Sequence, residues 1–267
     1  MTDQERYLFD LRGFLVVENL LTGEEFAACN EALDRHGPLI RPRPEEQSLS
    51  GASEALRGEQ GRLEITRNLL TLEQPWCEPF RRLLVHPGII PYLTELIGPG
   101  FRLDHGPGLI GAVEGTEGHV LHGGGEPYDP SQYYYHKNGR MYNGLCVVSW
   151  QLTDVNEGDG GFCCIPGSHK SNYPCPPEIK RYEAWRDCVY QVPAPAGSAI
   201  LFTEALTHGT LPWRGAGPRR SILFKYSPGF LAWGGGYPPP EELLAELSPE
   251  ARLVMERPYR SNRRTLT

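Results

Sequence analysis

A histidine, an arginine and a serine have the types and spacing that a metal-dependent reaction of a 2-oxo acid needs. Arg219 follows His208 by eleven positions, and Ser221 comes two positions later. A neutral imidazole nitrogen binds metal ions, and a guanidinium matches a carboxylate with two parallel hydrogen bonds. Residues two apart on a strand point to the same side, so Arg219 and Ser221 are expected to hold one carboxylate. The pattern predicts a metal ligand beside a carboxylate clamp.

Three longer segments extend this pattern. They are DLRGFLVVENLLTGEEFAACNEALDR from Asp10 to Arg35, LCVVSWQLTDVNEGDGGFCCIPGSHKSN from Leu145 to Asn172, and APAGSAILFTEALTHG from Ala194 to Gly209. Together with the spacing after His208, they resemble the phytanoyl-CoA dioxygenase-like family of iron(II)/2-oxoglutarate-dependent oxygenases. The resemblance implies that His208 is the distal iron ligand and that Arg219 and Ser221 hold the far carboxylate of 2-oxoglutarate. Trp150 is our candidate for a further residue facing the co-substrate, with Gln151 as the alternative on the same strand.

The order of the expected elements favours a mainly β fold. Thr22 with Glu25 has the pattern of a helix N-cap and its capping-box partner, and a helical stretch over 78–97 is broken by Pro87. Short strands punctuated by glycine and proline follow from Phe101, and a helix is expected from Glu241 to Leu247. We therefore expect a double-stranded β-helix (a jelly roll, cupin-like) with flanking α-helices. Residues 1–267 are expected to form a single domain with a helical N-terminal part and a helical C-terminal extension.

Composition and charge exclude several kinds of partner. The chain of 267 residues carries a formal net charge of −7 and has a pI of about 5.7, which argues against a nucleic-acid polymer or an anionic membrane surface. No apolar run approaches the length of a membrane span, and the start of the chain is too charged for a signal peptide. The seven cysteines are expected to be reduced thiols. We expect a cytoplasmic enzyme with a small-molecule substrate.

The first metal ligand has to precede the central strand at 145–152, and no histidine there has the usual partner. Non-haem iron oxygenases use two histidines and one carboxylate, and the first histidine normally begins a His-x-Asp or His-x-Glu pair. None of the histidines in range has Asp or Glu two residues later: His105, His119, His122 and His136. We choose His122, because it ends a strand-like run before Gly123–Gly125. Strand alternation places His119 on the opposite face, and His136 remains the alternative ligand.

A glycine where the carboxylate normally stands changes the expected chemistry. His122-Gly123-Gly124 resembles the His-x-Gly and His-x-Ala sites of iron/2-oxoglutarate halogenases, in which a halide fills the vacated iron position. The resemblance implies a halogenase using Fe(II), 2-oxoglutarate, O2 and chloride, with Gly124 at the halide position. One alternative is a hydroxylase whose carboxylate comes from elsewhere, for instance Glu114, Glu126 or Asp129. A second alternative is a non-catalytic binding protein on a jelly-roll scaffold.

For the halogenase and for the hydroxylase alike, we expect the substrate to be a small free molecule. Lys137, Arg140 and Arg67 are the basic residues that we expect to anchor an anionic substrate. One halogenase of this kind acts on a purine nucleotide in the 2′-chloropentostatin pathway, so a nucleotide or nucleoside is one substrate class that the resemblance allows.

Overall fold

The computed structural model describes residues 1–65, 68–125, 127–234 and 239–266. The α-helices are α1 Asp3–Arg12, α2 Gly23–Arg35, α3 Glu78–Leu83, α4 Ile90–Ile97, α5 Pro177–Lys180, α6 Glu241–Glu246 and α7 Pro249–Val254. The strands are β1 Phe14–Val17, β2 Ile40–Pro42, β3 Leu63–Ile65, β4 Arg102–Ala112, β5 His119–His122, β6 Tyr134–Lys137, β7 Arg140–Asn143, β8 Cys146–Gln151, β9 Gly161–Cys164, β10 Tyr190–Gln191, β11 Ala199–Thr203, β12 His208–Leu211 and β13 Arg219–Ser227.

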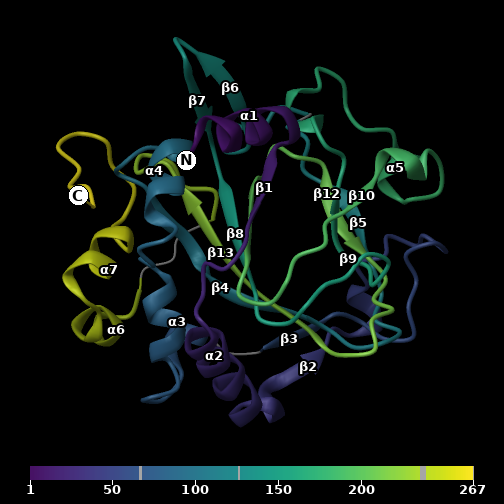
Figure 1. The fold of residues 1–267 in the computed structure, drawn as a ribbon, viewed down its shortest axis with the longest axis horizontal. Helices are drawn as coiled ribbons and strands as arrows, with labels where there is room; N and C mark the ends of the chain where they lie inside the picture. The colour runs from purple at the N-terminus through teal and green to yellow at the C-terminus, as the bar shows by residue number, and fades with distance from the viewer. Residues whose placement is uncertain (66–67, 126, 235–238, 267) are drawn as a thin grey trace.

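Two antiparallel sheets lie face to face and enclose the site (Figure 1). The larger sheet has seven strands in the order β1-β11-β8-β13-β4-β3-β2, and the smaller has four in the order β10-β9-β12-β5. A separate hairpin of β6 and β7 projects from the top of the view in Figure 1. Phe14 and Phe202 of the large sheet pack with Phe162 of the small sheet in one buried cluster. The space between the sheets is therefore partly filled by apolar side chains, and the remainder is open to polar ones.

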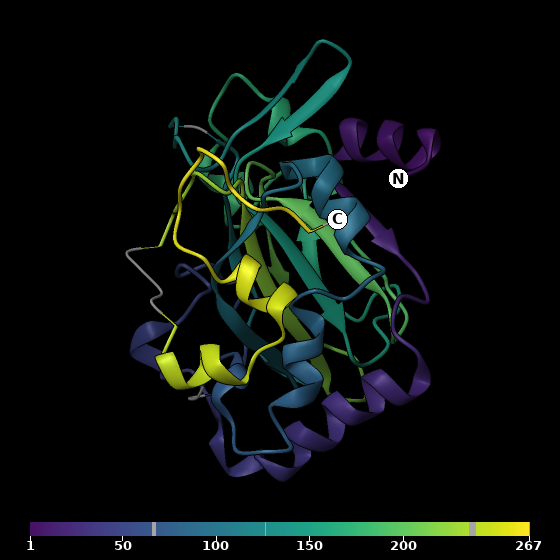
Figure 2. The same cartoon turned by 90° about the vertical axis from the view of Figure 1, so that its left-hand side faces the viewer.

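Helices cover the outer face of the large sheet (Figure 2). The main core joins α2, α3 and α4 to the outward side chains of β8 and β13, among them Trp150, Phe224 and Tyr226. Those three side chains are fully buried. The prediction of a mainly β fold with flanking helices is confirmed, and both sheets are antiparallel.

Two local features predicted from the sequence, the helix cap at Thr22 and the break near Pro87, are present in the structure. Thr22 caps α2, and the capping box with Glu25 is complete, so the side chain of each residue accepts from the backbone N–H of the other. The helical stretch over 78–97 is divided into α3 and α4, with Pro87 between them, because proline lacks the N–H that a continuous helix requires. All seven cysteines are free thiols. Within the described residues, no helix is long and apolar enough to cross a membrane.

Candidate functional site

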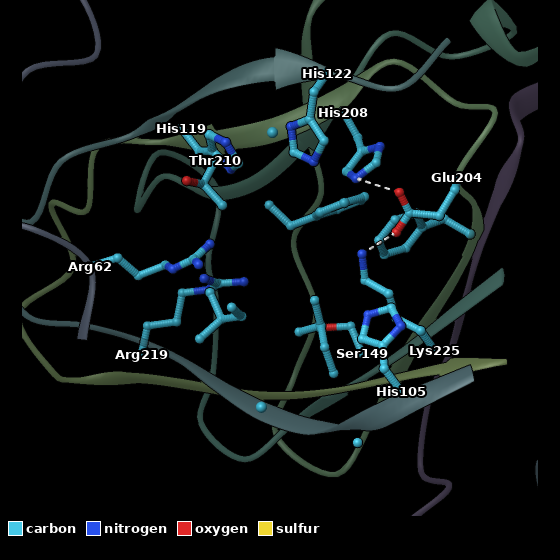
Figure 3. A pocket seen from close by; sticks show the side chains of 17 residues that line it. Arg62, His105, His119, His122, Ser149, Glu204, His208, Thr210, Arg219 and Lys225 are labelled. Atoms are coloured by element: carbon cyan, nitrogen blue, oxygen red, sulfur yellow. Dashed lines mark ion pairs between the residues drawn. The ribbon is translucent and has the colours of Figure 1, made fainter. Parts of the chain in front are cut away.

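A cavity of about 270 Å³ lies between the two sheets. Its walls come from β4, β8 and β13 of the large sheet and from β5 and β12 of the small one. Figure 3 shows His122, His208 and Glu204 at one side, the guanidinium groups of Arg62 and Arg219 at one end, and His105, Ser149 and Lys225 at the other. The cavity therefore holds a cluster of side chains that can bind a metal. Two arginines lie at one end, and His105, Ser149 and Lys225 lie at the other.

His122 and His208 face each other across the β5–β12 ladder. They are direct partners in the antiparallel register, and their ring centroids are 4.3 Å apart. Nδ1 of His122 lies 3.1 Å from the carbonyl oxygen of Val120, and Nδ1 of His208 lies 2.7 Å from that of Leu206. A carbonyl can only accept, so each Nδ1 carries the proton and each Nε2 is left as a lone-pair donor. Such backbone bonds fix the orientation of ligand imidazoles.

The protonation state of both histidines suits metal binding. Burial, together with the nearby His122, lowers the pKa of His208 to about 3. Burial also lowers the pKa of His122. Both rings are therefore neutral near pH 7, which is the form that binds metal ions.

Glu204 completes the cluster and is a residue that the sequence analysis missed. It lies in the turn between β11 and β12, is 3% exposed, and has Oε2 3.9 Å from Nε2 of His208. Burial alone would raise the pKa of Glu204, but Lys225, with Nζ 2.7 Å from Oε1, and His208 outweigh burial and lower the pKa to about 2. The side chain is an anionic carboxylate at neutral pH.

The three side chains form the donor set expected of a non-haem iron site. One ligand atom from each of His122, Glu204 and His208 lies within 4.8 Å of the others, which is the two-histidine, one-carboxylate set that suits iron(II). The carboxylate precedes His208 by four residues, whereas the sequence search looked two residues after the first histidine. The available signal was a lone acidic residue inside the apolar run Ala199–Leu206.

The carboxylates named from sequence lie elsewhere. Glu114 is exposed, and Asp129 accepts hydrogen bonds from the backbone and the hydroxyl of Ser131. Glu126 is outside the described residues. Neither Glu114 nor Asp129 belongs to the metal-ligating cluster that the described residues form.

Gly124 lies close to the cluster in sequence, but its missing side chain would point to Thr207. A Cβ at Gly124 would come 2.7 Å from Oγ1 of Thr207, and the backbone there has φ +96. That conformation is one that residues with side chains rarely adopt. Gly124 is also not among the residues that line the cavity. An aspartate at this position would be strained before its carboxylate reached the histidines.

His119 is a correction to the alternation argument. It was expected on the face opposite to His122, yet both rings line the cavity, and their centroids are 4.3 Å apart. His122 pairs with His208 and His119 with Thr210, so three steps along β5 match two steps along β12. This irregularity adds a residue to β5 and turns the side chain of His119 inward.

The end of the cavity that was predicted to bind a carboxylate holds two arginines, Arg62 and Arg219, where the sequence predicted one. Arg219 is 4% exposed, no described acidic residue forms an ion pair with it, and its Nε has no hydrogen-bond partner among the described residues. Burial and the charge of Arg62 lower its pKa to about 10, so it remains a cation. Arg62 was not predicted; it pairs with Glu64 and lines the same end of the cavity, as does Thr210. A buried, unpaired guanidinium is costly, so this end fits a bound carboxylate.

Ser221 lies on the same face of β13 as Arg219, as predicted, but its hydroxyl already has an acceptor. Its Oγ donates to Oε1 of Gln151 at 2.8 Å, and Nε2 of Gln151 donates in turn to Oγ of Ser149. Ser221 does not line the cavity, whereas Thr210 does. Thr210 is a hydroxyl-bearing residue that lines the cavity together with Arg219.

The placement of Trp150 corrects the sequence prediction. Trp150 is fully buried against the helices, with its ring 5.3 Å from that of His86. Its neighbour Ser149 lines the cavity. The prediction was wrong because the sequence gives the alternation of β8 but not which of its faces the helices cover.

The other predicted site residues do not meet at the cavity. Lys137 and Arg140 lie on the β6–β7 hairpin, where the two residues pair with each other, and the guanidinium of Arg140 stacks on Tyr142. His136, the alternative ligand, is an exposed residue of the same hairpin. Arg67 is outside the described residues.

The sequence itself identifies the family. The phytanoyl-CoA dioxygenase (PhyH) family matches residues 9–221, most of the chain. The chain belongs to the phytanoyl-CoA dioxygenase family. It is therefore an enzyme of the iron(II)/2-oxoglutarate-dependent dioxygenase type. No curated protein sequence matches the chain.

Solved structures with a similar fold extend the comparison. HygX from Streptomyces hygroscopicus, with nickel, 2-oxoglutarate and hygromycin B bound, has a TM-score of 0.69 at 22% identity, covering 87% of this chain and 89% of HygX. AviO1 from Streptomyces viridochromogenes Tue57 has a TM-score of 0.60 at 17% identity, covering 88% and 96%. The carbocyclase SnoK from nogalamycin biosynthesis has 0.58 at 18% identity, covering 93% and 92%. These likenesses show that the chain shares the fold of the three proteins.

Proposed function

We propose that this protein is an iron(II)/2-oxoglutarate-dependent hydroxylase of an aliphatic C–H bond in a small molecule. The observation that carries the proposal is Glu204, a buried carboxylate beside Nε2 of His208 and opposite His122. It supplies the ligand that the His-x-Gly sequence lacks. We assign His122, Glu204 and His208 as the metal ligands, and Arg219 with Arg62 and Thr210 as the holder of the far carboxylate of 2-oxoglutarate.

The chain's own residues provide binding, orientation and charge. With 2-oxoglutarate and O2, a bound iron(II) supplies the oxidising power for an unactivated C–H bond. His122, Glu204 and His208 would hold the ion at the wall of the cavity. Phe162 and Phe202 flank the imidazole of His208 with centroids 6.0 and 4.7 Å away, which keeps water from that side of the ligand.

Halogenation is the second candidate, and Gly124 is the observation that motivates it. A halide is needed where no carboxylate reaches the metal. In this structure Glu204 already brings a carboxylate to the cluster, so a halide is not needed to supply the missing negative ligand. Thr207 also occupies the direction in which a side chain at Gly124 would extend. We therefore place oxygen transfer ahead of chlorination, and Gly124 as a halide position becomes the less favoured assignment.

The substrate is proposed to belong to natural-product metabolism. HygX binds hygromycin B, SnoK is a carbocyclase of nogalamycin biosynthesis, and both have this fold. A nucleotide substrate has less support, because Lys137 and Arg140 lie away from the cavity.

Three further assignments are part of the proposal. The two facing sheets are proposed to form the double-stranded β-helix, and the helices and sheets a single domain, because α2, α3 and α4 share one core with β8 and β13. A cytoplasmic location is proposed from the seven free thiols.

The product distinguishes the two candidate reactions. A panel of small molecules is first screened for compounds that increase the release of succinate from 2-oxoglutarate. Mass spectrometry of each such compound then shows which atom was added to it. We expect a product that carries oxygen and no chlorine, in the same yield with and without chloride, because Glu204 fills the ligand position. A product that forms only with chloride and carries chlorine would establish the halogenase instead.

Arg219→Lys is expected to weaken 2-oxoglutarate binding by roughly 10–100-fold. A hydrogen bond to a charged group contributes about 1.5–3 kcal/mol, each 1.4 kcal/mol is about tenfold in affinity, and lysine cannot reproduce the bidentate geometry. Calorimetric titration of 2-oxoglutarate, with zinc(II) replacing iron, measures the change.

Arg220→Lys is the matched control. Arg220 faces away from the cavity and binds Asp34 of α2 at 2.6 Å, as strand alternation predicts. Its replacement should leave the 2-oxoglutarate affinity within about twofold, since an exposed ion pair contributes little. Equal affinities in wild type and Arg219→Lys would contradict the clamp assignment.

A further inference from the structure

The end of the cavity opposite the two arginines is formed by His105, Ser149 and Lys225 (Figure 3). His105 of β4 and Lys225 of β13 are direct partners in the ladder. Between the Leu223–Gly108 pair and this one, β4 advances three residues while β13 advances two. The extra residue turns the side chain of His105 into the cavity. Apart from the ion pair of Lys225 with Glu204, no described residue of this end contacts an assigned ligand or co-substrate residue.

Asp104 fixes the orientation of His105. Its carboxylate is fully buried and lies 2.8 Å from Nδ1 of His105, with the backbone N–H groups of Trp233 and Gly234 at 2.9 and 3.1 Å and a guanidinium nitrogen of Arg102 at 3.1 Å. Burial alone would raise the pKa of Asp104, but its hydrogen bonds with His105 and with the two backbone N–H groups outweigh burial and lower it. The carboxylate accepts a hydrogen bond from Nδ1–H of His105, so the other ring nitrogen, Nε2, is the one available to a ligand.

Trp233 does not line the cavity itself, but it contacts two residues that do, His105 and Lys225, and presents a flat apolar surface beside them. Its side chain is half-exposed, yet its ring centroid lies 5.5 Å from that of His105, with 35° between the planes. Nζ of Lys225 lies 5.5 Å from the indole centroid, and the backbone N–H is held by Asp104. A large aromatic ring that is fixed in place and still open to solvent is suited to stacking on a ligand.

The charges at this end compensate one another. Lys225 pairs with Glu204 at 2.7 Å and Arg102 pairs with Asp104 at 3.1 Å, so the described residues leave no unmatched cation at this end for an anionic group. The opposite is true at Arg219, which has no acidic partner among the described residues. The hydroxyl of Ser149 accepts from Gln151 and can donate its own proton into the cavity.

We propose that His105, Ser149, Lys225 and Trp233 form the substrate subsite, and that the substrate presents a neutral polyhydroxylated ring, such as a sugar or cyclitol unit. Nε2 of His105 accepts from a ring hydroxyl, Ser149 and Lys225 donate to ring oxygens, and the C–H face of the ring stacks on Trp233. The proposal rests on the proposed function, because the subsite adjoins Glu204 and so brings a ring C–H bond near the metal ligands. His105 positions the substrate and takes no part in the oxidation.

Saturation-transfer NMR on the full chain with zinc(II) and 2-oxoglutarate tests the subsite without turnover. The probes are the methyl glycosides of glucose, galactose and mannose, and myo-inositol, each compared with its phosphorylated counterpart. We expect saturation of ring C–H protons in at least one neutral probe and a weaker signal from its phosphorylated form. Trp233→Ala and His105→Phe should each reduce the signal at least fivefold. His105→Phe keeps a ring against Trp233 while removing Nε2.

The control is Trp185→Ala, which removes an exposed tryptophan that, unlike Trp233, has no ring contact with His105 or Lys225 and should leave the signal unchanged. The affinity for 2-oxoglutarate, measured on the same samples, shows that each variant is folded. The proposal is overturned if no neutral probe is saturated, if the phosphorylated form binds better, or if Trp233→Ala binds as wild type does. Wild-type protein that fails to bind 2-oxoglutarate would instead refute the proposed function, so the two failures are distinguishable.

Discussion

Glu204→Ala is expected to abolish oxidation of the substrate and to weaken metal binding by roughly 100-fold or more. Residues that only orient a ligand are worth about 10–100-fold in metal affinity or activity, and Glu204 is assigned as a ligand itself. The variant also removes the partner of Lys225, whose Nζ lies 2.7 Å from the carboxylate. Competition with a chromophoric chelator measures the metal affinity, and succinate release measures turnover.

Glu114→Ala is the control for Glu204→Ala. Glu114 was one of the carboxylates considered from the sequence, and its side chain is exposed and outside the cluster. The variant should bind metal as wild type does. If Glu204→Ala retained metal affinity and turnover, the carboxylate would not be a ligand, and chloride at an open position would become the better account of His122-Gly123-Gly124.

His122→Ala is expected to remove stoichiometric metal binding, while His136→Ala should leave it unchanged. His122 is opposite His208 in the ladder, and its Nδ1 is fixed on the carbonyl of Val120, so Nε2 is oriented toward the cluster. His136 is exposed on the β6–β7 hairpin. Metal content after anaerobic loading and desalting gives the comparison.

The two variants also separate the alternative ligand assignments. Loss of metal in His136→Ala with retention in His122→Ala would reverse our choice. His208→Ala should behave as His122→Ala does, because two remaining donors hold the ion poorly. Folding of each variant is checked by its thermal unfolding, since His208 is buried among Phe162 and Phe202.

The sequence by itself determined the family and a mainly β fold, and it named two of the three side chains of the cluster of His122, Glu204 and His208. Its strongest signals were local: the spacing from His208 to Arg219, the capping box at Thr22, and the strand ending in glycines at His122. Alternation along β13 placed Arg219 toward the cavity and Arg220 toward α2. A residue two or three positions away along a regular strand has a direction that the period of the strand fixes, so such predictions need no tertiary information.

The tertiary structure decided the features that depend on irregular pairing and on which elements cover a face. Extra residues in β5 and β4 turned His119 and His105 into the cavity, and nothing in their local sequence marks a register shift. Trp150 faced the helices because they cover that side of the large sheet. Glu204 became a candidate ligand because the turn between β11 and β12 directs its side chain toward His208. Arg62, which directly precedes β3, lines the same cavity as Arg219 although the two are far apart in the sequence. Each of these depends on contacts between segments that are far apart in the chain, which a local pattern does not encode.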